Sequence, residues 1–271
     1  MSGKSEQPSS LAITKKVAEL LERGDAAVVI TVARGESVGA KLLLDETGNA
    51  VGSLGAAELD SLVVPQVSQF LQSRDETRLI GVKDFAADFP SAGETFLLFE
   101  RLQPSPRLVV CGAGHVGASL AKLGVFLGYE TTLIDDRAEF LQRERFANDA
   151  IELVVASDWS SAVRDVIGNG RGVSVAVVTR GHSEDEQCMR AVIETNPNYV
   201  GLIGSKRRTS IVIERLRERG ASEEELRKIR APIGLDIGAV SPEEVALAII
   251  AEIVAERHGA AGGSLSAWRR K

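Results

Sequence analysis

A glycine-rich hexapeptide is the segment of this chain whose residue types and spacing point most directly to chemistry. Residues Gly112–Gly117 read G-x-G-x-x-G, between a short apolar run and a segment with helical apolar spacing. This order is the dinucleotide-binding pattern, in which N–H groups at the helix start bind a pyrophosphate. Gly112 would allow the tight turn, Gly114 would let backbone approach the phosphates, and Gly117 would permit close helix–strand packing. His115 would stand at the helix start over the phosphates.

A carboxylate follows at the distance where this pattern places a ribose-binding group. Asp135 lies about 20 residues beyond Gly114, at the end of the next apolar run. A carboxylate there accepts hydrogen bonds from ribose hydroxyls and repels a 2′-phosphate, which favours NAD over NADP, although the nearby Arg137 weakens that preference. The alternative is that the glycines only permit tight packing and bind no ligand.

A second candidate binding segment carries three consecutive cations. Ser205, Lys206, Arg207 and Arg208 follow the apolar run 199–203 and open a predicted helix. Because ligands bind at the carboxyl edge of open α/β sheets, these residues are suited to hold an anion. The alternative is a solvated charge run at the start of a surface helix.

Proton transfer has three weaker candidates. His182 and Asp185 follow the apolar run 173–179, and a histidine there could exchange protons near neutral pH. Lys206 is the third candidate. The alternative for His182 is a hydrogen-bonding or capping role. The chain has three dispersed histidines and two cysteines without C-x-x-C spacing, so the sequence predicts no metal site.

These residues need a sheet that brings their loops to one edge, and the second part of the chain predicts it. Its apolar runs are continuous, which is typical of parallel strands buried on both faces. The pattern predicts a doubly wound, Rossmann-like α/β domain over residues 107–271, with Ser183, Ser222 and Ser241 as helix N-caps. The expected strands are 108–111, 131–135, 152–156, 173–179 and 199–203, and the expected helices are 115–127, 159–167, 185–195 and 208–219.

The first part of the chain predicts a smaller α+β domain over residues 1–102. Two prolines within Gln103–Arg107 disfavour helix and sheet alike, which marks the boundary. Helices are expected at 11–23 and 57–71, strands at 26–33, 78–82 and 94–100, and a hairpin at 40–44 and 50–54.

Composition narrows the function classes. The 271 residues carry a formal charge of −6, which gives no basic field for nucleic acid or an anionic membrane. With 44% hydrophobic and 26% charged residues, the chain is typical of globular proteins. The longest apolar stretch, Val245–Ala255, is too short to span a bilayer, and Met1–Ser10 lacks the apolar core of a secretory signal. These features predict a cytoplasmic protein.

The ordered motifs of the second domain resemble those of the XdhC/CoxI family. The resemblance is thinner in the first domain, at 28–33, 39–41 and 51–55. Where that family has G-x-I-G-G-G-x-x-E, commonly with a cysteine, this chain has alanine at Ala56 and Ala57, aspartate at Asp60 and no cysteine. The matching blocks of the second domain are 108–117, 134–140, 144–146, 179–185, 199–208, 231–239 and 241–245.

The resemblance implies an accessory role rather than turnover catalysis. Proteins of this family bind the molybdenum cofactor, a molybdopterin, and deliver it to xanthine dehydrogenase or a related molybdenum hydroxylase, while a cysteine desulfurase supplies sulfur. CoxI-like members serve carbon monoxide dehydrogenase. A homodimer is the default state by analogy. The phosphate or nucleotide of the pterin would suit the glycine loop and the Ser205–Arg208 cations.

Two other functions stay open at this point. One is an NAD(P)-dependent oxidoreductase, in which Asp135 would bind ribose and His182 or Lys206 would donate a proton. The other is a relative that has lost cofactor handling and acts through protein contacts, which the altered residues Gly52–Asp60 suggest.

Overall fold

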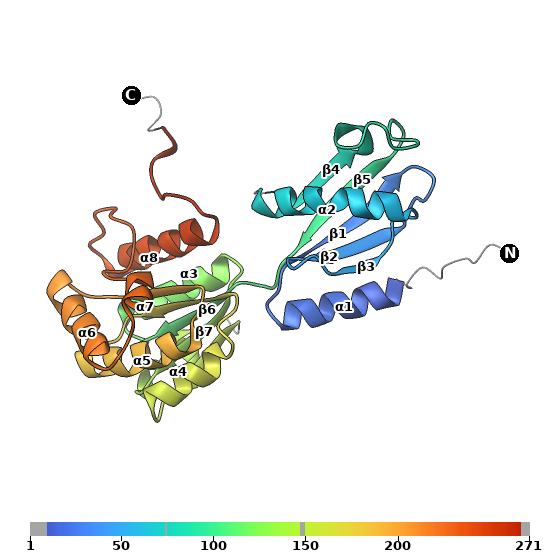
Figure 1. The fold of residues 1–271 in the computed structure, drawn as a ribbon. Helices are drawn as coiled ribbons and strands as arrows, with labels where there is room; N and C mark the ends of the chain where they lie inside the picture. Colours follow the sequence, from blue (N-terminus) through green and yellow to red (C-terminus); the bar gives the residue numbers. More distant parts are fainter. Residues whose placement is uncertain (1–9, 74, 147–149, 267–271) are drawn as a thin grey trace. The chain divides into compact units, whose positions relative to one another are not determined.

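Two units with separate hydrophobic cores make up the chain, Met1–Pro104 and Ser105–Lys271. The computed structural model describes residues 10–73, 75–146 and 150–266 (Figure 1). The boundary between the two units lies within the proline-containing segment Gln103–Arg107. All of the polar segment Met1–Ser10 except Ser10 lies outside the described residues.

The first unit is a five-stranded antiparallel sheet with one long helix on each face (Figure 1). Its strand order is β3-β2-β1-β5-β4, and β1 is central, paired with β2 and β5. The elements are α1 (Ser10–Glu22), β1 (Ala27–Arg34), β2 (Lys41–Asp45), β3 (Ala50–Gly52), α2 (Ala57–Gln72), β4 (Thr77–Gly81), the 3-10 turn η1 (Val82–Asp84) and β5 (Phe96–Leu102).

The apolar side chains of β1 point alternately to the two faces of the sheet, and a helix covers each face. Val28 and Ile30 share a core with Phe70 of α2, whereas Val29 packs with Leu20 of α1. Because side chains of a strand point alternately to opposite faces, a continuous apolar run buries both faces. The predicted α+β character of this domain is confirmed.

The second unit is a six-stranded parallel sheet with helices on both faces. Its strand order is β11-β10-β9-β6-β7-β8, the doubly wound order that reverses direction beside β6. The elements are β6 (Arg107–Cys111), α3 (His115–Phe126), β7 (Glu130–Asp135), η2 (Ala138–Phe140), η3 (Arg143–Arg145), β8 (Ile151–Val155), α4 (Trp159–Ile167), β9 (Val173–Val177), α5 (His182–Thr195), β10 (Tyr199–Leu202), α6 (Lys206–Glu218), α7 (Glu223–Lys228), β11 (Ile229–Arg230) and α8 (Pro242–Arg257).

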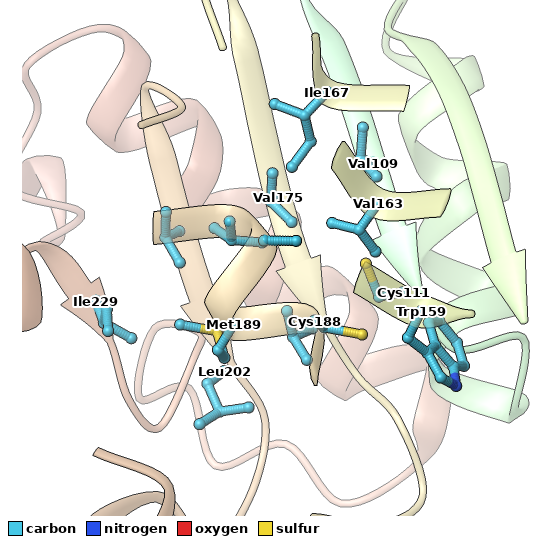
Figure 2. Close-up of a cluster of buried hydrophobic side chains, with 14 of the residues drawn as sticks. Val109, Cys111, Trp159, Val163, Ile167, Val175, Cys188, Met189, Leu202 and Ile229 are labelled. Carbon is cyan, nitrogen blue, oxygen red and sulfur yellow. The ribbon is translucent and has the colours of Figure 1, made fainter. Parts of the chain in front are cut away.

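Each face of this sheet has its own core. Val109 and Cys111 of β6 pack with α4, α5 and α6, as Figure 2 shows for Val163, Ile167 and Met189. Leu108 and Val110 pack on the opposite face with α3 and α8. The strands are therefore buried on both sides, and the predicted Rossmann-like fold is confirmed.

Two of the three helix N-caps predicted from the sequence are confirmed. Ser222 and Ser241 are N-caps that form capping boxes with Glu225 and Glu244, as predicted. The expectation for Ser183 was wrong, because α5 begins at His182 and the extended Gly181 takes the N-cap position. No helix in the described ranges is long and apolar enough to cross a membrane.

Replacement of Gly117 by alanine should test the contact between α3 and the turn after β6. A Cβ on Gly117 would overlap the carbonyl oxygen of Gly112, which is backbone and cannot move aside easily. We expect Gly117→Ala to lower the free energy of unfolding by about 2–3 kcal/mol.

The matched control is Gly114→Ala, since no atom lies within 4 Å of the position its Cβ would take. We expect a loss of less than about 1 kcal/mol, that of alanine at an N-cap. Urea denaturation measures both variants, and equal losses would show that Gly117 is not required for packing.

Candidate functional site

The six parallel strands end at one edge of the sheet, and the loops that follow them carry the candidate residues. The glycine loop follows β6, Asp135 closes β7, and Arg180 to Asp185 follow β9. The cations Lys206 to Arg208 follow β10. Ligands of open α/β sheets bind at this carboxyl edge, beside the strand where the order reverses. The fold thus brings all the predicted site residues to the edge where a ligand is expected.

The glycine loop has the geometry that each of its glycines was expected to provide. Gly112 has a φ of +115°, and a Cβ there would lie 2.6 Å from the carbonyl oxygen of Val178. Gly117 touches Gly112 backbone to backbone, whereas the space beside Gly114 is open. Gly114 is the N-cap of α3 and no side chain caps that turn, so the first N–H groups of the helix lack an intrahelical acceptor. This end of α3 is suited to bind an anion.

Asp135 holds the glycine loop in place. Its side chain is 1% exposed, and Oδ2 accepts hydrogen bonds from the backbone N–H of Ala113 at 2.7 Å and from Nη2 of Arg137 at 3.0 Å. Oδ1 accepts two more bonds, from Nε and the backbone N–H of Arg137. Burial by itself raises the pKa of Asp135, but the hydrogen bonds from Arg137 and Ala113 outweigh it and lower that pKa. The carboxylate is ionised and fully engaged with protein donors.

Arg137, the partner of Asp135, is held by a ring contact and an ion pair. Its guanidinium carbon lies 3.8 Å from the centroid of the Phe140 ring, and its side chain is 27% exposed. The ion pair with Asp135 raises the pKa of Arg137 above its already high value. A ribose that reached Asp135 would compete with this guanidinium, which lies on the Phe140 ring and donates two side-chain hydrogen bonds to the carboxylate.

An ion pair crosses the glycine loop from one side to the other. Arg180, after β9, donates to both carboxylate oxygens of Asp136, after β7, each at 2.9 Å. It also lies 3.2 Å from Glu184 on α5. Because β6 lies between β9 and β7 in the sheet, this pair links the loops on both sides of the glycine loop. Sequence reasoning did not select Arg180 or Asp136, although Asp136 directly follows β7 and Arg180 lies in the loop after β9, both at the ligand edge.

A buried network joins the loops after β9 and β10. Asp185 is fully buried and accepts a hydrogen bond from the Thr179 hydroxyl at 2.6 Å. Arg208 donates to the same carboxylate from Nη2 at 2.6 Å and from Nε at 2.9 Å. Burial raises the pKa of Asp185, while the bonds from Thr179 and Arg208 act in the opposite direction. Asp185 and Arg208 therefore act as partners of each other inside the protein.

The remaining predicted residues are accessible. His115 and His182 are the exposed first residues of α3 and α5. Lys206 and Arg207 are exposed at the start of α6, and in the part of the chain that the structure describes neither forms an ion pair. Ser205 caps this helix by accepting from the N–H of Arg208 at 3.2 Å. Of the predicted cationic cluster, Lys206 and Arg207 are thus the members whose charge is open to a ligand.

Both cysteines lie beneath this edge, within the core. Cys111 of β6 and Cys188 of α5 are fully buried (Figure 2). Burial, together with the neighbouring Cys111, raises the pKa of Cys188 well above that of a free thiol. Both side chains are shielded from solvent within the core, so they contribute packing.

Replacement of Arg208 should show that it serves the buried Asp185. We expect Arg208→Met to cost about 3 kcal/mol of unfolding free energy at pH 7, since it leaves an unpaired buried carboxylate. The loss should shrink towards pH 4, because without Arg208 the pKa of Asp185 rises further and the protonated acid needs no cation. Between the unfolded value of about 3.9 and this raised value, the folded state binds more protons, so stability falls as pH rises.

Arg207→Met is the matched control and should change stability by less than about 0.5 kcal/mol at either pH. Adding Asp185→Asn to Arg208→Met should recover part of the loss. Urea denaturation at both pH values tests this, and a loss independent of pH would contradict the assignment.

Comparison with known proteins identifies the second unit. A family model described as the XdhC Rossmann domain matches residues 108–253, more than half of the chain. The crystal structure of a xanthine dehydrogenase from Bacillus halodurans superposes with a TM-score of 0.65 at 18% identity, covering 92% of this chain and 67% of that chain. At that identity the superposition shows a shared fold.

Relatives are similar over part of their length. The uncharacterized protein YqeB of Escherichia coli is 30% identical over 232 residues, which are 83% of this chain and 41% of that protein. A probable xanthine dehydrogenase subunit from Bacillus subtilis is 27% identical over 169 residues, 60% of this chain and 46% of that protein. The molybdenum cofactor insertion chaperone PaoD of Escherichia coli is 25% identical over 163 residues, 58% of this chain and 50% of that protein.

The matches to these three relatives thus span half of their lengths or less. The family model, in contrast, covers the whole glycine loop, both ion-paired networks and the start of α6. On the strength of that match, the chain belongs to the XdhC family.

Proposed function

We propose that this protein binds the molybdenum cofactor and passes it to a molybdenum hydroxylase of the xanthine dehydrogenase type. The observation that carries the proposal is the open position beside Gly114, at the uncapped start of α3, inside the domain that the XdhC model matches. The names of two relatives, a cofactor insertion chaperone and a probable xanthine dehydrogenase subunit, support the cargo and the client.

The residues at the edge fit the phosphorylated end of such a cargo. Backbone N–H groups at the start of α3 would bind a phosphate, and the missing side chain of Gly114 leaves room for it. Lys206 and Arg207 would add two unpaired positive charges from the start of α6. Asp135 would act indirectly, by holding the N–H of Ala113 and therefore the shape of the loop. His115 and His182 would line the approach as exposed polar groups.

The arrangement favours a carrier over a turnover enzyme. Asp185, one of the proposed proton-transfer groups, is fully buried and bonded to Thr179 and Arg208. Lys206 is exposed, so it is suited to attract an anion rather than to exchange a proton with a buried group. In this proposal the protein acts as a homodimer that binds and releases the cofactor without itself changing it. The sulfur of the cofactor is supplied by a separate enzyme, a cysteine desulfurase.

Replacement of Gly114 by valine should separate binding from folding. The added side chain enters space that the protein leaves empty, so we expect a stability cost of about 1 kcal/mol or less. The phosphate, in contrast, would lose its approach to the backbone, and the amount of bound cofactor should fall at least about tenfold. Protein purified from a cofactor-producing host is assayed for pterin after oxidation and for activation of a xanthine dehydrogenase.

Gly93→Val is the control, because Gly93 also has no atom within 4 Å of its Cβ position and lies in the other unit. Wild-type protein that carries no pterin and adds nothing to hydroxylase activation would rule out the proposal.

The unpaired cations allow a second test of the same site. Lys206→Gln with Arg207→Gln removes two charges that take part in no described ion pair, so folding should be unaffected. We expect weaker cofactor retention and a shallower loss of binding as salt increases, since screening acts on the charges removed. Dialysis at rising ionic strength measures both effects, with Lys122→Gln and Arg190→Gln as a charge-matched control. An unchanged salt dependence would place the phosphate elsewhere.

The doubly wound strand order also favours one alternative, an oxidoreductase that uses NAD. It requires Asp135 to leave Arg137 for a ribose. Calorimetric titration with NAD and NADP distinguishes the two functions. Micromolar binding of either, lost in Asp135→Asn and accompanied by no bound pterin, would support the oxidoreductase.

A further inference from the structure

Three charged side chains of the second unit span the glycine loop at the edge of the parallel sheet. Arg180 donates from Nη1 and Nη2 to the two carboxylate oxygens of Asp136, both at 2.9 Å, and its Nη2 lies 3.2 Å from Oε1 of Glu184. We call these three residues the strap. Asp136 follows β7, the other two follow β9, and β6 lies between those strands. The strap therefore crosses the loop that follows β6.

The strap has an excess of negative charge. It contains two carboxylates and one guanidinium, whereas the start of α3 below it is the positive end of a helix. A phosphate bound at the start of α3 would be repelled by Asp136 and Glu184 for as long as both hold the guanidinium of Arg180. An anion therefore fits this place only if Arg180 turns towards it.

The strap is the most exposed of the three ion-paired networks described at this edge. The carboxylates of Asp135 and Asp185 are 1% and 0% exposed, so loss of their arginine partners would leave a buried charge. The side chains of Arg180 and Asp136 are 46% and 29% exposed. Water can solvate both of them when they separate, so this ion pair opens more easily than the buried ones.

Both partners of the strap have other groups to turn to. Asp136 Oδ1 lies 3.8 Å from Nε of Arg137, so the carboxylate keeps a cation nearby when Arg180 leaves. Nε of Arg180 forms no hydrogen bond within the ranges that the structure describes. A guanidinium has five N–H groups in a planar fork that fits phosphate oxygens, so Arg180 can bind a phosphate through two donors at once.

A buried donor without an acceptor lies at the same edge. Trp159 is the first residue of α4 and belongs to the core that contains Cys111, the last residue of β6. It is 5% exposed, and its indole Nε1 has no hydrogen-bond partner among the described residues. Figure 2 shows this nitrogen on the side of the ring away from Val163, beyond the end of β6. Because a buried N–H without an acceptor is costly, this donor is a second sign, independent of the helix end, that an acceptor completes the edge.

We propose that Arg180 binds the phosphate of the ligand at the start of α3, and that Asp136 competes with the ligand for it in the free protein. Arg180 is then the residue that lets this edge accept an anion, and the strap is its resting position. That a phosphate lies at the start of α3 rests on the proposed function, whereas the rest of the ligand plays no part in this step.

Inorganic pyrophosphate is the probe, because it presents phosphate oxygens without a ring or a ribose. Calorimetric titration of the full chain should show binding at least about tenfold weaker in Arg180→Met, since hydrogen bonds to a charged group are lost. Asp136→Asn should bind about threefold more tightly, the factor that an exposed ion pair contributes. Poor folding cannot cause a gain in affinity, so this second variant keeps the test decisive.

A double variant separates competition from simple repulsion. If Asp136 competes for Arg180, the gain from Asp136→Asn should be smaller in the Arg180→Met background. Repulsion alone predicts an equal or larger gain there, because Asp136 has then lost its main partner. Arg180→Lys, which keeps the charge without the planar fork, should bind with an affinity between those of wild type and Arg180→Met.

The matched control is the ion pair between Arg164 of α4 and Glu194 of α5. Its atoms are 2.8 Å apart and its side chains are 48% and 53% exposed, but it joins the last turns of the two helices, away from the carboxyl edge. Arg164→Met and Glu194→Gln should change the affinity by less than about twofold, because salt screens distant exposed charges. Gly114→Val should weaken binding in wild type and in Asp136→Asn alike, since it blocks the start of α3.

Four results would overturn the proposal: no pyrophosphate binding in wild type and Asp136→Asn, unchanged affinity in Arg180→Met, no gain in Asp136→Asn, or an equal or larger gain in the double variant. Normal binding in Gly114→Val would do the same, because pyrophosphate would then lie elsewhere. Thermal unfolding of each variant shows whether the fold is intact.

These results are distinguishable from the outcome for the proposed function. If pyrophosphate binds as described while purified protein carries no pterin, the assignment of Arg180 stands and the carrier function fails. If the cofactor is carried and its retention is the same in wild type, Arg180→Met and Asp136→Asn, the carrier function stands and the assignment of Arg180 fails.

Discussion

The backbone contact between Gly117 of α3 and Gly112 after β6 is the constraint on which the rest of the second unit depends. It lets the helix start directly at the strand end, without the separation that two side chains would impose. The first N–H groups of α3 therefore face the carboxyl edge at the centre of the sheet, where the strand order reverses. A wider turn would move this positive helix end away from the loops after β7, β9 and β10.

Ion pairs then order the loops around this turn. Asp135 ties the glycine loop to Arg137, Arg180 links the loops on both sides of β6, and Arg208 holds the loop after β9 to the start of α6. In the free protein these charges are satisfied by one another, so they contribute rigidity rather than free binding capacity. Lys206 and Arg207 differ from them because no described acidic residue pairs with either. The edge of the parallel sheet therefore suits an anionic group.

The sequence by itself determined the two-part organisation, the parallel sheet and the position of the glycine loop. These features depend on local order: continuous apolar runs, prolines at the boundary, serine caps at 222 and 241, and glycines at fixed spacing. Such patterns involve residues that are close in the chain. They therefore predict the same helix, strand or turn whichever other elements bury its apolar face. The hexapeptide Gly112–Gly117 is the clearest case, because the role of each glycine follows from its place in the turn.

Only the tertiary structure decided what the charged residues do. Asp135 and Arg208 were chosen as ligand contacts from their places after strand ends, yet each has a protein partner, Arg137 for one and Asp185 for the other. Asp185 and Arg208 are 23 residues apart in the chain, and Arg180 and Asp136 are 44 apart. Which carboxylate meets which guanidinium depends on how neighbouring strands align, and sequence spacing does not carry that information.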